Sequence, residues 1–222
     1  FYLSKEKKEF PGEIPLRKNL VIFLIFPEEG LKSSHLTTLN YFLNKKYSPL
    51  VISNYALSAE DKKKIKKNSW FLIERKNYGY DFGGYRDGVL FLKDRLFNLD
   101  RMLLINDSTW FPISKNNDFL NFIETADLDF VGATSHYGFE RLRLPKNRDE
   151  LKRKIKFNTK KRRFHYASYV LAFSKNILSD KNFLRFWKNL RLSGTKNIIV
   201  RRGEVGLTQW VIKKEIYSHG SY

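Results

Sequence analysis

The sequence predicts an α/β fold: a single domain with an open, mostly parallel sheet flanked by helices. Strand-sized apolar runs alternate with helical segments along the 222 residues, the order typical of parallel strands joined by helices. The run from Asn19 to Phe26 is apolar almost throughout, which favours a strand covered on both faces. No internal repeat or low-complexity linker divides the chain, so one domain is predicted over residues 1–222.

Local signals place each element of the first half. Pro27 and Gly30 end the first strand. Ser33 or Ser34 can cap the helix that follows, in which apolar residues recur at helical spacing. A short apolar run after this helix completes a βαβ unit. The further elements predicted here are a strand at 50–52, a basic helix at 59–67, a strand at 70–73 and a helix at 82–96.

In the second half, the same alternation is interrupted once. Between Glu140 and Phe164 the pattern gives way to a basic stretch, which we interpret as an insertion within the domain, residues 140–164. A last helix is predicted from Glu204, and residues 218–222 are predicted to form a loop. The remaining predicted elements are strands at 101–105, 130–133, 169–173 and 198–200, and helices at 119–125 and 182–190.

The amino-acid composition excludes several kinds of site. Because the chain has no cysteine, a disulfide framework, a zinc–cysteine site and a thiol nucleophile are excluded, and a reducing cytoplasm is the expected location. No apolar run approaches the roughly eighteen residues that a bilayer span needs. The sequence begins at Phe1 rather than Met, so we expect it to be part of a longer protein.

Charge is the most unusual property of the chain. It has 42 Lys and Arg against 23 Asp and Glu, a net charge of +19, which predicts a polyanionic partner or an anionic membrane surface. Residues 152–163 are mostly basic; they suit docking to anionic lipid headgroups at the inner face of a membrane, or form a solvated run that aids solubility. Nucleic-acid binding is the weaker alternative, because no helix-turn-helix, zinc-finger or RNP signature is present.

The first motif with chemical content follows the predicted strand at 70–73. Glycines at 79, 83 and 84 allow the backbone to approach a ligand closely, and Asp81 sits at a helix entrance where it could accept hydrogen bonds from a ribose or a base. The spacing matches neither a dinucleotide fingerprint nor a P-loop. The alternative is a tight strand-to-helix turn capped by Asp81.

A second motif, Asn106, Asp107 and Ser108, ends the next strand along the chain. A carboxylate at the carboxyl end of a parallel strand faces the ligand crevice, where Mg²⁺ or Mn²⁺ could bridge it to a diphosphate. Alternatively, Asp107 or Ser108 caps the next turn. The two motifs together, in order and at successive strand ends, favour a ligand site.

The third motif precedes the last predicted helix. Glu204 at a helix start could take a proton from a sugar hydroxyl, and Arg201 and Arg202 could hold phosphate oxygens. Alternatively, Glu204 is a first-turn acid favoured by the helix dipole and the arginines are solvated.

Taken together, the motifs resemble the rhamnan synthesis protein F family. The resemblance rests on residues 77–83, 106–108 with Pro112, 129–134, 168–173 and 204–208, which occur in the family's order and span most of the chain. It implies a single GT-A-like (Rossmann-like) glycosyltransferase domain of bacterial surface polysaccharide synthesis, such as rhamnose-containing O-antigen (lipopolysaccharide) or capsule. A nucleotide-sugar donor and a glycan or lipid-linked glycan acceptor are implied as partners.

Carried over to this chain, the resemblance implies a nucleotide-sugar pocket, a catalytic base and a divalent cation. Asp107 becomes a catalytic carboxylate and cation ligand, Glu204 the base, and His219 is predicted as a second cation ligand. The family's glutamine before Ser168 is Ala167 here, and the metal motif has one carboxylate instead of two, so a catalytically silent glycan-binding domain is the alternative. The predicted nucleotide-sugar-binding residues are Asn77, Gly79, Asp81, Asn106, Asp107, Ser108, Arg201 and Arg202.

Overall fold

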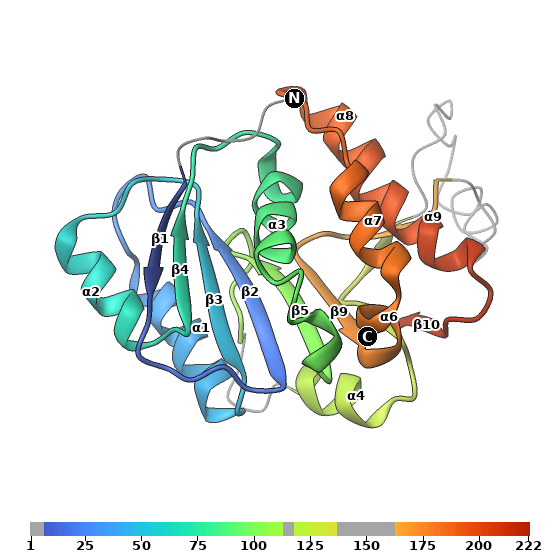
Figure 1. Ribbon diagram of the computed structural model, residues 1–222, viewed down its shortest axis with the longest axis horizontal. Coiled ribbons are helices and arrows are strands. Elements are labelled where there is room, and N and C mark those ends of the chain that lie inside the picture. Colours follow the sequence, from blue (N-terminus) through green and yellow to red (C-terminus); the bar gives the residue numbers. More distant parts are fainter. Residues whose placement is uncertain (1–6, 113–117, 137–162) are drawn as a thin grey trace, which may run out of the picture.

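The computed structural model describes residues 7–112, 118–136 and 163–222 (Figure 1). The predicted basic insertion at 140–164 lies outside the described residues except for its last two. The α/β prediction is confirmed: an eight-stranded sheet, in which most neighbouring strands are parallel, lies between two layers of helices. In the part of the chain that the structure describes, no helix is long and apolar enough to cross a membrane.

The sheet has the strand order β1-β4-β3-β2-β5-β9-β6-β10. Strands β2, β3, β4 and β5 are parallel neighbours, as are β6 and β10, whereas β1 and β9 run antiparallel to the strands they contact. A separate two-stranded ribbon pairs β7 with β8. The strands are β1 (Lys8–Pro11), β2 (Asn19–Ile25), β3 (Ser48–Ser53), β4 (Phe71–Glu74), β5 (Arg101–Asn106), β6 (Phe130–Gly132), β7 (Ser135–His136), β8 (His165–Tyr166), β9 (Val170–Ser174) and β10 (His219–Ser221).

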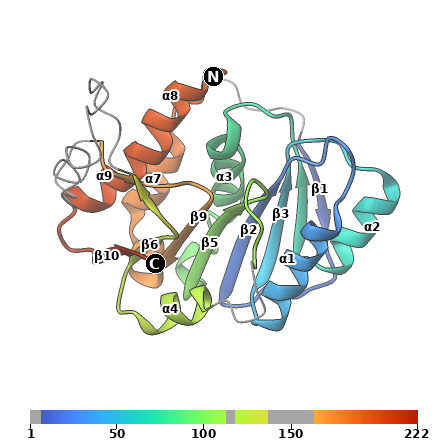
Figure 2. The ribbon, with the colours of Figure 1, turned by 180° about the vertical axis from the view of Figure 1, so that it is seen from behind.

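Helices cover both faces of the sheet (Figures 1 and 2). Helices α1, α2 and α4 pack on one face, against a core that includes Phe23 of β2; α3, α6, α7, α8 and α9 pack on the other, against a core that includes Ile22. Alternate residues of each buried strand therefore pack into different cores. The helices are α1 (Ser33–Asn44), α2 (Ala59–Lys67), α3 (Tyr80–Phe91), η1 (Leu96–Asn98), α4 (Phe119–Thr125), α6 (Lys175–Ser179), α7 (Lys181–Asn189), α8 (Lys196–Val200), η2 (Arg201–Val205) and α9 (Gly206–Lys213).

Two predicted elements are wrong. Residues 198–200 form the end of helix α8 instead of a strand: only Ile199 is buried, as a helix packed on one side requires. Residues 218–222 are not a loop throughout, because His219–Ser221 forms the edge strand β10 beside β6. Its residues carry no alternating apolar pattern, so the strand depends on pairing with β6 and has no local signal of its own.

Candidate functional site at the carboxyl ends of the strands

The structure brings the first two motifs into contact. Asn106 is the last residue of β5, and Asp81 lies in the first turn of α3, the helix that follows the parallel strand β4. The Asn106 side-chain amide donates to Asp81 Oδ2 over 2.9 Å, while its own Oδ1 accepts from the Ser108 backbone N–H over 3.2 Å. Asn106, Asp81 and Ser108 therefore form one polar cluster at the strand ends.

Glycines shape the entrance to α3. Gly79 has a φ of +84° immediately before the helix, a left-handed conformation that glycine adopts readily. A Cβ at Gly83 would lie 2.0 Å from the Tyr78 carbonyl oxygen, so the chain can fold back this tightly only without a side chain there. The turn is as tight as predicted at these two glycines, but the predicted cap is wrong: Gly79 is the N-cap residue and no side chain caps it. The Asp81 carboxylate accepts from Asn106 instead.

Glu204 lies in the single π-helical turn η2, between α8 and α9. Its Oε1 accepts a hydrogen bond from the Ser168 hydroxyl over 2.6 Å, and its Oε2 lies 3.5 Å from His165 Nε2. The other ring nitrogen of His165 donates to the Arg163 carbonyl over 2.9 Å, so the ring is held in place and, when protonated, faces Glu204 with a second N–H. The carboxylate is thus fixed by two neighbours while remaining partly accessible.

The carboxylates of this region influence one another. Burial raises the pKa of Asp81, and the negative charges of Glu204 and Asp107 raise it further, against the lowering effect of the Asn106 hydrogen bond and the Lys196 charge. Tyr85 lies beneath them, fully buried, and donates its hydroxyl to the Ser168 carbonyl over 2.9 Å. Asp81 and Tyr85 are therefore both within electrostatic range of Glu204 and Asp107.

Asp107 lies on the opposite face of the sheet from Asn106, because successive residues of an extended chain point to opposite sides. Its Oδ2 accepts from the Phe26 backbone N–H over 2.7 Å and lies 3.2 Å from His35 Nε2. His35 Nδ1 accepts from the Lys32 N–H, so Nε2 carries the ring proton and donates to Asp107. Asp107, His35 and the exposed Trp110 help to line a pocket of about 260 Å³.

The predicted cation pair is not assembled. His219 is in register with Phe130, at the start of β6, and its Nδ1 is 2.8 Å from the Tyr166 hydroxyl. Three strand spacings and about five residues along the sheet separate it from Asp107, on the order of 20 Å. The described residues contain no group of three or more acidic, histidine or cysteine side chains that could hold a metal ion.

Three further residues of the predicted pocket, Asn77, Arg201 and Arg202, lie at the surface. Asn77 and Arg201 are exposed. Arg202 donates to the Arg191 carbonyl over 3.1 Å, on the side of the helix that faces α7, whereas Glu204, two residues on, faces Ser168. The structure therefore does not bring Arg202 to the Glu204 cluster.

Three residues of the site were not predicted. His165 and His35 were missed as partners of Glu204 and Asp107, because each lies on an element whose position depends on the fold. Arg75 is buried after β4, where it pairs with Asp87 over 2.7 Å and donates to Asn54 and to the Tyr78 carbonyl. Arg75 therefore links the loop before Gly79 to Asn54 and to Asp87 of α3. An arginine directly after an apolar strand is the signal that could have found it.

Comparison with solved structures gives several matches. Core-mannan synthase A of Aspergillus fumigatus, in its Mn/GDP form, aligns with 78% of this chain and 63% of its own at 11% identity and a TM-score of 0.40. The mannosyltransferase Ktr4p of S. cerevisiae aligns with 83% of this chain and 64% of its own at 10% identity and a TM-score of 0.35. These scores are too low to carry over details of a site.

Sequence comparison gives closer matches. An uncharacterized protein, y4gN, of Sinorhizobium fredii (strain NBRC 101917 / NGR234) is 31% identical over 198 residues, which cover 89% of this chain. The chain spans about half of that relative's length, 47%. Residues 50–216 match the family described as Rhamnan synthesis protein F. Because this match runs from β3 through α9 and covers well over half of the chain, the protein belongs to the rhamnan synthesis protein F family.

Proposed function

We propose that this chain is a glycosyltransferase domain, which moves a sugar from a nucleotide diphosphate sugar to a hydroxyl of a growing, lipid-linked bacterial surface polysaccharide. The observation that carries the proposal is the fixed carboxylate of Glu204 beside the Asp81–Asn106 pair, at the strand ends where ligands of open α/β sheets bind. Membership of the rhamnan synthesis protein F family supports polysaccharide synthesis as the setting.

Glu204 is the proposed base for transfer with inversion. The acceptor hydroxyl gives its proton to Glu204 as its oxygen bonds to the anomeric carbon of the donor, and the bond from that carbon to the diphosphate breaks. Ser168 and His165 hold the carboxylate so that a free oxygen lone pair faces the acceptor. All groups in this step belong to the protein and its two substrates.

The donor nucleotide is proposed to lie across the ends of β2, β3 and β5. Phe26 and Tyr55, each 42% exposed, follow β2 and β3 and meet edge to face at 5.9 Å, which offers an apolar surface to a base. Asp81 accepts from donor hydroxyls. The charge of Lys196 lowers the pKa of Asp81, and we propose that Lys196 stabilises the leaving diphosphate, a role predicted for Arg201 and Arg202.

The proposal is tested by turnover with a panel of nucleotide sugars. Glu204→Gln keeps the size of the side chain but removes its basicity, so we expect a loss of about 10²–10⁴ in turnover with an unchanged melting temperature. Glu29→Gln, at a side chain 82% exposed, is the matched control and should be fully active. Equal rates for wild type and Glu204→Gln would remove Glu204 as the base and point to a retaining reaction.

Donor binding is tested separately by thermal shift. A nucleotide that binds only the folded state raises the melting temperature, and the panel is run with and without Mn²⁺ on wild type and on Asp107→Ala. We expect stabilisation by one class of nucleotide diphosphate, reduced in the variant because Asp107 positions the Phe26 backbone. No shift and no turnover would favour the silent glycan-binding domain instead.

A further inference from the structure

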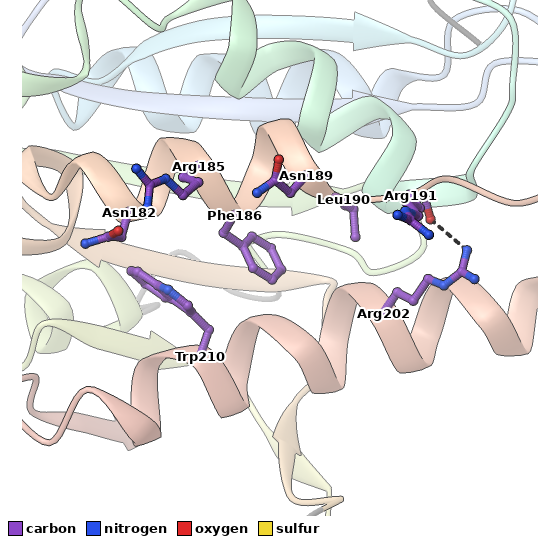
Figure 3. Close-up of a pocket in the computed structure, with 8 residues that line it drawn as sticks. All are labelled: Asn182, Arg185, Phe186, Asn189, Leu190, Arg191, Arg202 and Trp210. Carbon is purple, nitrogen blue, oxygen red and sulfur yellow. Dashed lines mark hydrogen bonds between the residues drawn. The ribbon is translucent and has the colours of Figure 1, made fainter. Parts of the chain in front are cut away.

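A groove separates α7 from the helix that runs from η2 into α9 (Figure 3). Its volume is about 400 Å³, within the range of roughly 300–1,000 Å³ that small-molecule sites occupy. In Figure 3, the side chains of Phe186 and Trp210 point toward one another from the two helices. The groove is lined by Asn182, Arg185, Phe186, Asn189, Leu190, Arg191, Arg202 and Trp210.

The apolar part of the groove is aromatic. The rings of Phe186 and Trp210 have centroids 6.3 Å apart and planes inclined by 40°. Both side chains are half-buried, and Lys214 Nζ lies 5.8 Å from the centroid of the Trp210 ring. Aromatic faces pack well against the C–H face of a sugar ring. Asn189 adds an amide group that can both donate to and accept from sugar hydroxyls, and Asn182, whose side-chain amide donates to Asp180 over 3.0 Å, adds an amide oxygen.

The polar rim is positively charged. Arg185, Arg191 and Arg202 line the groove, and none of the lining residues is acidic. Two acids lie two residues from the lining in sequence. Asp180 accepts from the backbone and side-chain amides of Asn182 and from the Tyr217 hydroxyl, and it pairs with Lys214. Glu204 accepts from Ser168. A guanidinium presents paired N–H groups that match a carboxylate.

We propose that this groove binds an acidic saccharide, whose ring packs on Phe186 and Trp210 and whose carboxylates pair with the arginines at the two ends. The site is separate from the proposed catalytic centre, because Arg202 and Glu204 face opposite sides of the same helix. The proposal therefore stands whether or not the chain transfers sugar. A single-stranded nucleic acid shares the two chemistries, but it needs successive stacking platforms along a strand, and the groove offers one aromatic pair.

The test is calorimetric titration of the whole chain with trigalacturonate as the acidic probe. Maltotriose supplies neutral rings, inorganic pyrophosphate supplies charge without a ring, and an oligothymidylate supplies the nucleic acid. We expect trigalacturonate to bind at least about tenfold more tightly than each of the other three. Arg185→Gln combined with Arg202→Gln should weaken it by about tenfold or more, since each removes a charge-assisted hydrogen bond.

The matched control is Lys188→Gln combined with Lys213→Gln, which removes the same two charges from α7 and α9 at exposed positions outside the lining. It should bind trigalacturonate as wild type does. If the two double variants lose the same affinity for trigalacturonate, binding depends on net charge and the proposed groove site is wrong. Maltotriose, pyrophosphate or oligothymidylate binding as tightly as trigalacturonate would also overturn the proposal, and so would the absence of any binding.

Discussion

The carboxylates of Glu204, Asp107 and Asp81 have different hydrogen-bond partners and therefore different environments. Glu204 accepts from a hydroxyl and faces a histidine, and Asp107 accepts from a backbone N–H and a histidine. Asp81 is half-buried, accepts from one amide and feels the charges of the other two acids. Burial and the charges of Glu204 and Asp107 both favour the protonated form of Asp81, so its pKa is raised. The three acids therefore suit different tasks: a base, a positioning group and a hydroxyl-binding group.

Replacing Asp81 by asparagine should stabilise the fold at neutral pH. Because the pKa of Asp81 is raised above 3.8 on folding, the folded state holds its proton more tightly, and stability falls as pH rises between the unfolded and folded values. The Asp81→Asn variant removes this cost and keeps an oxygen that can accept from Asn106. Urea midpoints measured from about pH 3.5 to about pH 7 should show an advantage for Asp81→Asn that grows with pH.

We expect the opposite effect on stability when Asp180 is replaced by asparagine. Burial raises its pKa, but hydrogen bonds from Asn182, Tyr217 and Lys214 outweigh burial and lower the pKa overall. Asp180→Asn should therefore cost stability at neutral pH, and the cost should vanish as pH falls through the lowered pKa. If both variants lose stability with the same pH dependence, the pKa assignment for Asp81 is incorrect.

At the residue scale, sequence reasoning could pair Asp81 with Asn106 because the carboxyl ends of parallel strands share one edge. Sequence reasoning placed Asn106 and Asp107 in one pocket. In the structure their side chains point to opposite faces of the sheet, and each face packs against a different set of helices. His219 failed as a cation ligand because edge pairing with β6 holds it far from Asp107.

At the element scale, the helix from Lys196 to Lys213 explains the main error. Three β-branched residues at 198–200 favour a strand locally. The backbone is instead helical without interruption through α8, η2 and α9, which buries Ile199, Leu207 and Val211 against α3 and α7. Packing of one helical face outweighs the local preference, and the π turn in the middle is where Glu204 is presented.

Gly203 lets this helix approach α3. A Cβ there would lie 2.3 Å from the ring of Phe82, which is buried and stacked on Trp187. Gly203→Ala should therefore destabilise the protein by about 1–3 kcal/mol through overpacking. Calorimetry should show a melting temperature lowered by about 2–4 °C for each kcal/mol.

Gly206 supplies the matched control in the same helix. The nearest atom to a Cβ at Gly206 is 3.7 Å away, an ordinary contact, and its φ of −60° is helical. Gly206→Ala should be neutral or stabilising by up to about 1 kcal/mol, since alanine is the better helix former. A melting temperature for Gly203→Ala equal to that of Gly206→Ala would refute the close approach to Phe82.

At the scale of the whole molecule, the order of helices and strands was predictable and the sheet's edges were not. Continuous apolar runs such as Val21–Ile25 identify strands buried on both faces, whatever surrounds them. The antiparallel β1 and the short β10 carry no such run, because edge strands are held by pairing with a neighbour. The position of the proposed site was also predictable, because it lies at the carboxyl ends of these parallel strands.

The net charge of +19 belongs to the whole molecule, and its proposed role is attachment to an anionic membrane surface. The densest run, residues 152–163, lies almost wholly outside the described residues, so its sequence alone supports this prediction. Replacing Lys160, Lys161 and Arg162 by Ser should weaken binding to phosphatidylglycerol-containing vesicles by about a hundredfold, at about 1 kcal/mol for each charge near the surface. Cosedimentation at fixed salt measures it, with phosphatidylcholine vesicles as the uncharged reference.

A second triple variant separates a local segment from total charge. Replacing Lys63, Lys66 and Lys67 of helix α2 by Ser removes the same number of charges from a described surface. If the segment docks, this variant binds vesicles as wild type does, because charges away from the membrane contribute little beyond a screening length of about 8–10 Å. Equal loss from both variants would mean that only the overall charge attracts the protein. If both triple variants bind vesicles as tightly as wild type does, the prediction of electrostatic docking is wrong.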